Sequence, residues 1–299
     1  MQILVTGASG FIGRRLCPAL VEQGHDVRAM TRRPEDYDGA GVPVYGDVQT
    51  PETLGAALES CDAAYYLVHS LASADFERLD AEAARSFAAA AAAGRIDRIV
   101  YLGGLGRTDD DLSPHLRSRR EVERLLSESA VAVTTLRAGI VVGHGGISWE
   151  LTRQLVARLP AMVTPRWVNT RTQPIAVSDV VSYLIGVLDR PEAANRTLEI
   201  GGPDVLRYAS MMRRLAEIEG RRRLLVPVPL MTPRLSSYWL SLVTDVDTQA
   251  GRSLIESMRN EVVVTDDAIR RLVPLEPLGY DAAVRVALAE RAAAIQGRP

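Results

Sequence analysis

The first two-thirds of the chain alternates short apolar segments typical of β-strands with longer segments typical of α-helices. Strands that alternate with helices build β-α-β units, whose parallel sheet is covered by helices on both faces. The sequence therefore predicts an α/β fold with a doubly wound parallel sheet. The expected strands are Gln2–Thr6, Asp26–Met30, Pro43–Tyr45, Ala63–Val68, Arg98–Leu102 and Val133–Leu136. The expected helices are Gly10–Gln23, Pro51–Leu58, Asp75–Ala93 and His115–Ser127.

Beyond Val142 this alternation loosens, and most segments are expected to be helical. We expect residues 1–145 to form the sheet domain and residues 146–299 to form a small, mostly helical cap, with elements near 172–202 returning to the sheet. The expected helices are Trp149–Leu159, Val177–Leu188, Tyr208–Glu219, Thr232–Val243, Ser253–Asn260 and Tyr280–Ala294. The expected strands are Thr197–Ile200 and, in a separate small sheet, Leu224–Val228.

A glycine-rich turn joins the first expected strand to the first expected helix. Its glycines allow a tight turn, a close approach of the backbone to a diphosphate, and close packing of helix on strand. The helix N-terminus adds free N–H groups and the positive end of a dipole. The turn therefore predicts a dinucleotide-binding Rossmann domain. The expected cofactor contacts here are Thr6, Gly7, Ser9, Gly10, Phe11, Ile12 and Gly13.

The end of the second expected strand indicates which nicotinamide cofactor is bound. An NAD site places an acid there, on the 2′-hydroxyl of the ribose. Here the strand is followed by Arg32 and Arg33, and arginine offers a planar, permanently charged fork suited to a phosphate. We expect NADP(H) in preference to NAD(H), with Arg32 as the first contact and Arg33 as either a second contact or a solvated side chain.

The spacing of the turn, with the residues TGASGFIG, resembles the short-chain dehydrogenase/reductase superfamily in its extended and atypical branches. Further phrases resemble atypical bacterial NAD(P)H-binding members, which are related to NmrA-like regulators and to the accessory nucleotide-binding subunit of respiratory complex I. Together they cover nearly the whole chain. The phrases are YYLVHS from Tyr65, SPHLRSR from Ser113, LRAGIVVG from Leu136, TQPI from Thr172, IGGP from Ile200 and PRLSSYW from Pro233.

This resemblance implies roles for residues that follow the later strands. Asp47 and Val48 take the place of the dipeptide that contacts adenine, and Leu67, Val68 and His69 lie along the ribose. The segment Ala138, Gly139 and Ile140 takes the place of the backbone that meets the nicotinamide carboxamide. Gln173 and Asp179 are expected to hold a later loop and helix, with Asp179 as a helix cap.

The superfamily's Ser-Tyr-Lys catalytic residues are absent from this sequence. Gly103, an expected cofactor contact, stands in place of the serine, while His115 and Arg119 stand in place of the tyrosine and lysine. In one interpretation His115 is the general acid, since histidine titrates near neutrality, although a nearby Arg119 disfavours its charged form. In the other, His115 orients the substrate or starts the helix, and Arg119 binds a ribose or phosphate of the cofactor.

Three other stretches of the sequence each fit more than one role. Residues 230–243 fit an apolar pocket wall, ordinary core packing or a shallow membrane contact. The arginines between Arg213 and Arg223 fit a solvated face better than a binding site for an acidic partner or nucleic acid, because the whole chain is not basic. The run Asp109 to Asp111 fits a solvated loop better than a metal site, because no His or Cys accompanies it.

Composition narrows the class of protein. The net charge of −2 argues against a nucleic-acid partner, and no apolar stretch reaches the length of a membrane span. Two cysteines and no leader-like segment fit a cytoplasmic protein, and we expect no metal. We expect an NADP(H)-dependent oxidoreductase that acts on a small apolar carbonyl or enone-like substrate. The alternative is a non-catalytic NAD(P)H-binding redox sensor or assembly factor with a protein partner.

Overall fold

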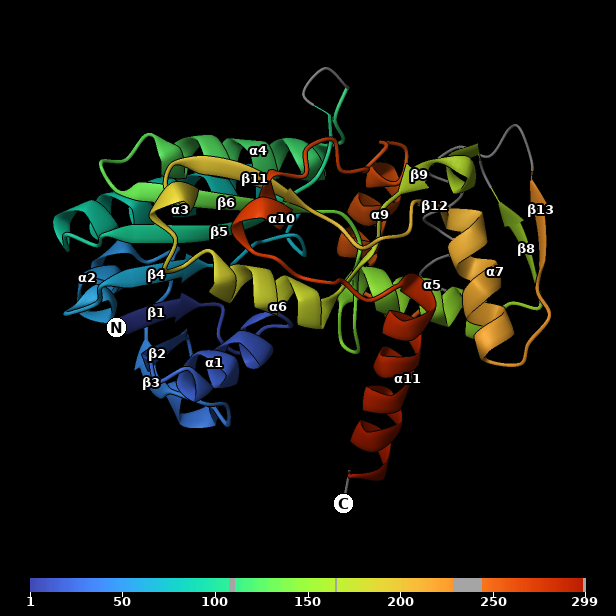
Figure 1. Cartoon of the computed structure of the whole chain (residues 1–299), viewed down its shortest axis with the longest axis horizontal. Coiled ribbons are helices and arrows are strands. Elements are labelled where there is room, and N and C mark those ends of the chain that lie inside the picture. Colours follow the sequence, from blue (N-terminus) through green and yellow to red (C-terminus); the bar gives the residue numbers. More distant parts are fainter. Residues whose placement is uncertain (108–110, 165, 228–243, 298–299) are drawn as a thin grey trace.

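A seven-stranded parallel sheet forms the middle layer of one half of the protein, on the left in Figure 1. The computed structural model describes residues 1–107, 111–164, 166–227 and 244–297. The strand order is β3-β2-β1-β4-β5-β6-β11, so the chain first builds outward from β1 to one edge and then from β4 to the other. This order confirms the predicted doubly wound sheet. The strands are β1 (Gln2–Thr6), β2 (Asp26–Thr31), β3 (Val42–Tyr45), β4 (Ala63–Tyr66), β5 (Arg98–Gly104), β6 (Ala132–Ala138) and β11 (Arg196–Ile200).

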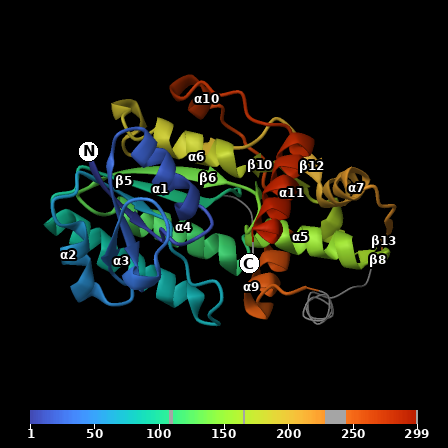
Figure 2. The ribbon, with the colours of Figure 1, turned by 90° about the horizontal axis from the view of Figure 1, so that it is seen from below.

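Helices cover both faces of this sheet (Figures 1 and 2). On one face, α1 (Gly13–Glu22) and α6 (Val177–Gly186) share an apolar core with the strands. On the other face, α2 (Leu54–Leu58), α3 (Phe76–Ala93) and α4 (Pro114–Ser127) form a second core. The alanine-rich stretch of α3 is a packed helix, as predicted, because small side chains and high helix propensity let it lie close to its neighbours.

Most of the C-terminal part forms a separate, largely helical core, with the two-stranded sheet of β8 and β13 at its outer end (Figure 1). The strand expected at 224–228 is present as β13, which pairs with β8. The helices of this core are α5 (Ile147–Arg158), α7 (Tyr208–Ile218), α9 (Thr248–Ser257) and α11 (Tyr280–Gln296). Helix α10 (Ala268–Leu272) instead packs against the central sheet beside β11. The short strand pairs are β7 (Val141–Val142) with β10 (Ile175–Ala176), β8 (Ala161–Thr164) with β13 (Leu224–Pro227), and β9 (Arg171–Thr172) with β12 (Leu206–Arg207). Short 3-10 helices are η1 (Pro34–Asp36), η2 (Pro51–Thr53), η3 (Arg166–Asn169) and η4 (Pro191–Ala193).

Several expected boundaries were wrong. The first helix begins at Gly13 instead of Gly10, because the residues before it form the turn. Helix α9 begins at Thr248 instead of Ser253, because the Asp247 carboxylate accepts a hydrogen bond from the Ala250 N–H and caps it. Asp179 is not the cap of α6, since it lies inside the first turn and accepts the Leu278 N–H at 2.8 Å. The helix expected at 232–243, and the whole 230–243 segment, lie outside the described residues.

No helix in the described ranges has both the length and the apolar character needed to cross a bilayer.

Candidate functional site

The residues expected to bind a cofactor converge on one edge of the sheet. Each group follows or ends a strand that is parallel to its neighbours, so all of them reach the carboxyl edge. The chain reverses its direction of winding between β1 and β4, and such a switch point is where open α/β sheets bind ligands. The expected residues that belong to this edge are Thr6 to Gly13 after β1, Arg32 and Arg33 after β2, Asp47 and Val48 after β3, Leu67 to His69 after β4, Gly103 on β5, and Ala138 to Ile140 at the end of β6.

The glycine-rich turn has the geometry of an anion-binding loop. Gly7 has a φ of +66°, and the Gly10 N–H donates to the Gly7 carbonyl oxygen at 2.9 Å. A Cβ added to Gly13 would lie only 2.3 Å from that same oxygen, so a side chain is excluded. The N–H groups of Phe11 and Ile12 have no acceptor among the described residues. A diphosphate fits this turn, because it would supply acceptors for these N–H groups at the positive end of α1.

Two side chains of the turn are already engaged inside the fold. The Thr6 hydroxyl donates to the Tyr65 carbonyl at 3.1 Å and accepts the Leu67 N–H at 3.0 Å. It therefore ties β1 to the end of β4. The Phe11 ring packs under the Arg15 guanidinium, 4.8 Å from the ring centroid. Both side chains shape the loop.

The residues expected to contact the adenosine end of the cofactor lie just beyond β2 and β3. Arg32 is exposed and forms no ion pair with any residue in the described ranges. Arg33 is also exposed and lies 3.7 Å from the Asp36 carboxylate. The Asp47 side chain accepts the Gln49 N–H at 2.9 Å, which stabilises its own turn. Of the two arginines, Arg32 is therefore the one with an uncommitted charge.

Arg119 is held in place by a buried carboxylate. Its guanidinium donates to Asp80 at 3.1 Å, and both side chains are less than a tenth exposed. Asp80 also accepts from Ser118 Oγ at 3.1 Å and from the Ser70 N–H at 2.7 Å, so it joins α3, α4 and the loop after β4. The Arg119 Nε is buried and has no partner among the described residues. An N–H group left unpaired in this way fits an oxygen atom of a bound cofactor.

His115 is held from the cap. Its Nδ1 lies 3.1 Å from the Oγ of Ser257, a residue at the end of α9. Ser257 Oγ also lies 3.0 Å from Ser113 Oγ and donates to the Ser253 carbonyl at 2.8 Å. Ser113 caps α4 as expected, since its Oγ accepts the Leu116 N–H. Helix α4 and helix α9 of the cap are thus joined through these hydroxyl groups.

Both histidines at this edge are neutral at physiological pH. Burial, the Arg119 charge and nearby His69 lower the pKa of His115 to about 3. Loss of hydration around the ring, and then the Arg119 charge, lower the pKa of His69 to about 4, while the nearby Asp80 charge opposes this shift. The His69 side chain is nonetheless exposed to solvent. Its pKa is still lowered, because Arg119 disfavours a second positive charge nearby even where solvent has access. His115 is therefore a poor proton donor at pH 7.

Sequence reasoning missed Asp80 and Ser257. The sequence did contain a signal for Asp80. It lies on the same helix face as Phe76, Ala84 and Phe87, and an acid on such an apolar face is expected to be buried. Ser257 carried none, because only the packing of α9 against α4 brings it to His115.

The remaining expectations concern loops and surface charge. Gln173 holds a later loop as expected, since its Nε2 donates to the Gly202 carbonyl and its Oε1 accepts the Val264 N–H. Within the basic stretch, Arg214 pairs with Asp281 and Arg223 binds the Val156 carbonyl at the end of α5. Of the run from Asp109 to Asp111, only Asp111 belongs to the described residues, and it is exposed. The described part of the chain holds no cluster of three metal-ligating side chains.

Comparison with known proteins agrees with this geometry. A family model for NAD(P)H-binding proteins matches residues 7–168, more than half of the chain. The ceramide reductase of Caulobacter vibrioides is 26% identical over 251 residues, which span 80% of this chain and 78% of that protein. The photosystem II assembly factor Ycf39 of Trieres chinensis is 22% identical over 244 residues, which span 79% of this chain and 75% of that protein.

Solved structures share the fold. The triphenylmethane reductase of Citrobacter sp., determined in complex with NADP(H), superposes with a TM-score of 0.77 at 16% identity. The match covers 96% of this chain and 100% of that one.

Proposed function

The chain belongs to the NAD(P)H-binding family, as an atypical member of the short-chain dehydrogenase/reductase superfamily, and from this premise we propose that it is an NADP(H)-dependent oxidoreductase. The glycine-rich turn with its unpaired N–H groups is the observation that carries the cofactor assignment. Bound NADPH supplies a hydride. We propose that the residues expected at the carboxyl edge hold the cofactor, with the free Nε of Arg119 directed to one of its oxygens.

The preference for NADP(H) over NAD(H) is proposed from Arg32. An uncommitted guanidinium just beyond β2 suits a 2′-phosphate, whereas the charge of Arg33 is partly balanced by Asp36. We expect Arg32→Ala to weaken NADPH binding by more than about tenfold and to leave NADH binding nearly unchanged. Arg33→Ala serves as the matched control and should have a smaller effect. Fluorescence titration of both cofactors measures this, and equal NADPH and NADH affinities in the unaltered protein would overturn the preference.

The proposed substrate is a small, largely apolar carbonyl or enone-like compound. Gly103 and neutral His115 stand where the superfamily's serine and acidic tyrosine would be, so neither supplies a proton at pH 7. Enones and quinones suit such a site, because the anion that they form on accepting a hydride is delocalised and needs no strong acid. The similarity to ceramide reductase supports reductase activity. Two buried free cysteines support a cytoplasmic setting.

The second candidate is a non-catalytic NAD(P)H-binding assembly factor or redox sensor with a protein partner. The missing Ser-Tyr-Lys residues and the similarity to Ycf39 favour it. The two candidates are separated by following the absorbance of NADPH with a panel of quinones, enones and aldehydes. Turnover of any member makes the protein an enzyme, and tight NADPH binding without turnover favours the assembly or sensor role.

A further inference from the structure

Arg14 joins the glycine-rich turn to the segment that follows β2. It is the second residue of α1 and lies four residues after Gly10, which has no side chain. Its Nε donates to the Ser9 carbonyl oxygen at 3.0 Å, so the side chain folds back over the turn. Its Nη1 lies 2.9 Å from the Asp38 carboxylate. The Arg14 guanidinium therefore contacts both of the elements that border the adenosine end of the candidate site.

Asp38 is kept near Arg14 by the residues on either side of it. The Tyr37 ring and Ala40 both pack against the apolar core that includes Cys17 of α1. The Tyr37 hydroxyl also donates to the Ala40 carbonyl oxygen at 2.8 Å, which closes the segment into a turn. The backbone on both sides of Asp38 is thus fixed against α1, and its carboxylate projects from there.

The ion pair of Arg14 with Asp38 is open to solvent. The Arg14 side chain is 49% exposed and the Asp38 side chain 72% exposed. A pair with this much access to water contributes little to the stability of the fold. It can therefore open when a stronger anion reaches the guanidinium.

A phosphate on the adenosine ribose is such an anion. In this kind of fold the diphosphate lies on the glycine-rich turn, and the ribose 2′-hydroxyl lies beside the residues at the end of β2. The additional phosphate of NADP(H) is carried on that hydroxyl, so it belongs between the two elements that Arg14 contacts. A phosphate monoester has a charge of about −1.5 to −2 at pH 7 and three acceptor oxygens, which suit the planar fork of an arginine.

We propose that Arg14 is a second cation of the 2′-phosphate site beside Arg32, and that Asp38 holds the Arg14 guanidinium until this phosphate displaces it. Asp38 then lowers the affinity for NADP(H), because its ion pair must open and its charge repels the phosphate. NAD(H) has no 2′-phosphate and leaves the pair intact. The inference rests on the proposed function in taking NADP(H) as the cofactor.

Arginine substitutions test the first half of the proposal on the full-length chain. Arg14→Ala should weaken NADPH binding by more than about tenfold and change NADH binding by less than about twofold, measured by fluorescence titration. Arg14→Lys keeps the charge and should retain more NADPH affinity than Arg14→Ala. Arg78→Ala is the matched control, because Arg78 is also half exposed and paired with an acid, but on α3. Equal losses of NADPH and NADH affinity in Arg14→Ala would show that Arg14 only shapes the turn, which would overturn the proposal.

A substitution of Asp38 tests the displacement. Asp38→Asn should tighten NADPH binding by about threefold or more and leave NADH binding unchanged. Glu35→Gln is the matched control, because it removes one negative charge from the same segment, and exposed Glu35 forms no ion pair within the described ranges. No gain in Asp38→Asn, or an equal gain in Glu35→Gln, would show that Asp38 does not compete with the phosphate for Arg14.

The phosphate itself is tested with 2′,5′-ADP and 5′-AMP, which differ only in the 2′-phosphate, as competitors of NADPH. In the unaltered protein 2′,5′-ADP should compete more than about tenfold better than 5′-AMP, and Arg14→Ala should remove most of this difference. Equal competition in the unaltered protein would overturn the NADP(H) preference together with the role of Arg14. A difference that persists fully in Arg14→Ala would overturn the role of Arg14 alone and leave the proposed function standing.

Discussion

At the scale of single residues, close approach explains the glycine-rich turn. Gly7 needs its positive φ, while Gly13 needs space, because the helix starts directly against the backbone of Gly7 and Ala8. The three glycines are therefore not interchangeable. A methyl group at Gly13 meets backbone atoms, which cannot rotate away as a side chain can.

We expect Gly13→Ala to abolish NADPH binding and to lower the melting temperature, since the added Cβ would lie 2.3 Å from a carbonyl oxygen and the loop must move. Gly55→Ala is the matched control in α2, because no atom lies within 4 Å of its added Cβ, and helical alanine is favoured over glycine by about 1 kcal/mol. Thermal melting and fluorescence titration of both variants measure the effect. Normal NADPH binding by Gly13→Ala would contradict this account of the turn.

At the scale of elements, Asp80 joins three segments that meet at the candidate site. It reaches from α3 to α4 through Ser118 and Arg119, and to the loop after β4 through the Ser70 N–H. Removing one member of a buried ion pair costs more than the pair contributes, because the remaining charge is left without a partner in a poorly solvated place.

We expect Asp80→Asn to lower the free energy of unfolding by about 3 kcal/mol and to weaken cofactor binding by releasing Arg119. Asp75→Asn, at the residue just before the same helix, is the control. Its partner Arg78 is exposed, and exposed pairs contribute less than about 1 kcal/mol. Urea denaturation measures both values. Equal losses in the two variants would mean that the buried pair does not hold these elements together.

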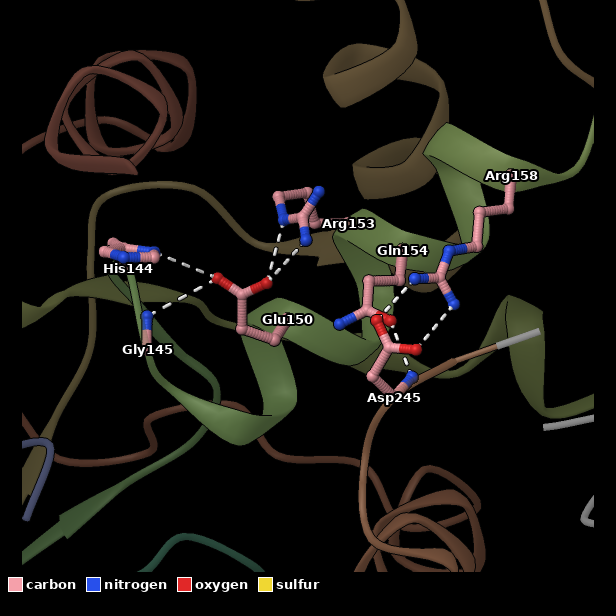
Figure 3. A network of polar contacts seen from close by, with 7 residues as sticks. All are labelled: His144, Gly145, Glu150, Arg153, Gln154, Arg158 and Asp245. Atoms are coloured by element: carbon pink, nitrogen blue, oxygen red, sulfur yellow. Dashed lines mark hydrogen bonds and ion pairs between the residues drawn. The ribbon is translucent and has the colours of Figure 1, made fainter. Parts of the chain in front are cut away.

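At the scale of the whole molecule, the sheet and the cap are joined by polar networks as well as by packing. Arg15 beside the glycine-rich turn binds the His144 carbonyl and pairs with Glu290 on α11. From the same loop, His144 Nδ1 and the Gly145 N–H contact Glu150, which also binds Arg153 (Figure 3). Farther along α5, Gln154 accepts the Asp245 N–H and Arg158 pairs with Asp245. Helix α5 therefore connects the sheet to the cap.

Glu150 makes this connection pH-dependent. Burial alone would raise the pKa of Glu150, but bonds from Arg153, Gly145 and His144 outweigh it, so the pKa is lowered. The stabilisation of the fold by ionised Glu150 is therefore fully present above pH 4.3, about the pKa of Glu in the unfolded chain, and is lost as the pH falls through the lower pKa of the folded chain.

Glu150→Gln should lower the free energy of unfolding at pH 7, and the difference from the unaltered protein should shrink progressively below about pH 4. Denaturation curves at both pH values measure this. The exposed Glu192→Gln is the control, and a pH-independent loss in Glu150→Gln would contradict the assignment.

The sequence by itself determined the doubly wound sheet and the location of the glycine-rich turn. The sheet could be predicted because alternating strands and helices allow few topologies. The turn could be located because Thr6 to Gly13 lead directly from a strand into a helix. The sequence also placed His115 and Arg119 on one helix face, since they are four residues apart. These are local properties of the chain.

Only the tertiary structure decided what these side chains can do. The charge state of His115 depends on its burial beside Arg119, and its Nδ1 contacts Ser257, which is 142 residues away. Asp80 reaches Arg119 across 39 residues. No spacing in the sequence encodes such contacts, because they arise when α3, α4 and α9 pack together, and the free energy of packing depends on shapes that meet only in the folded chain.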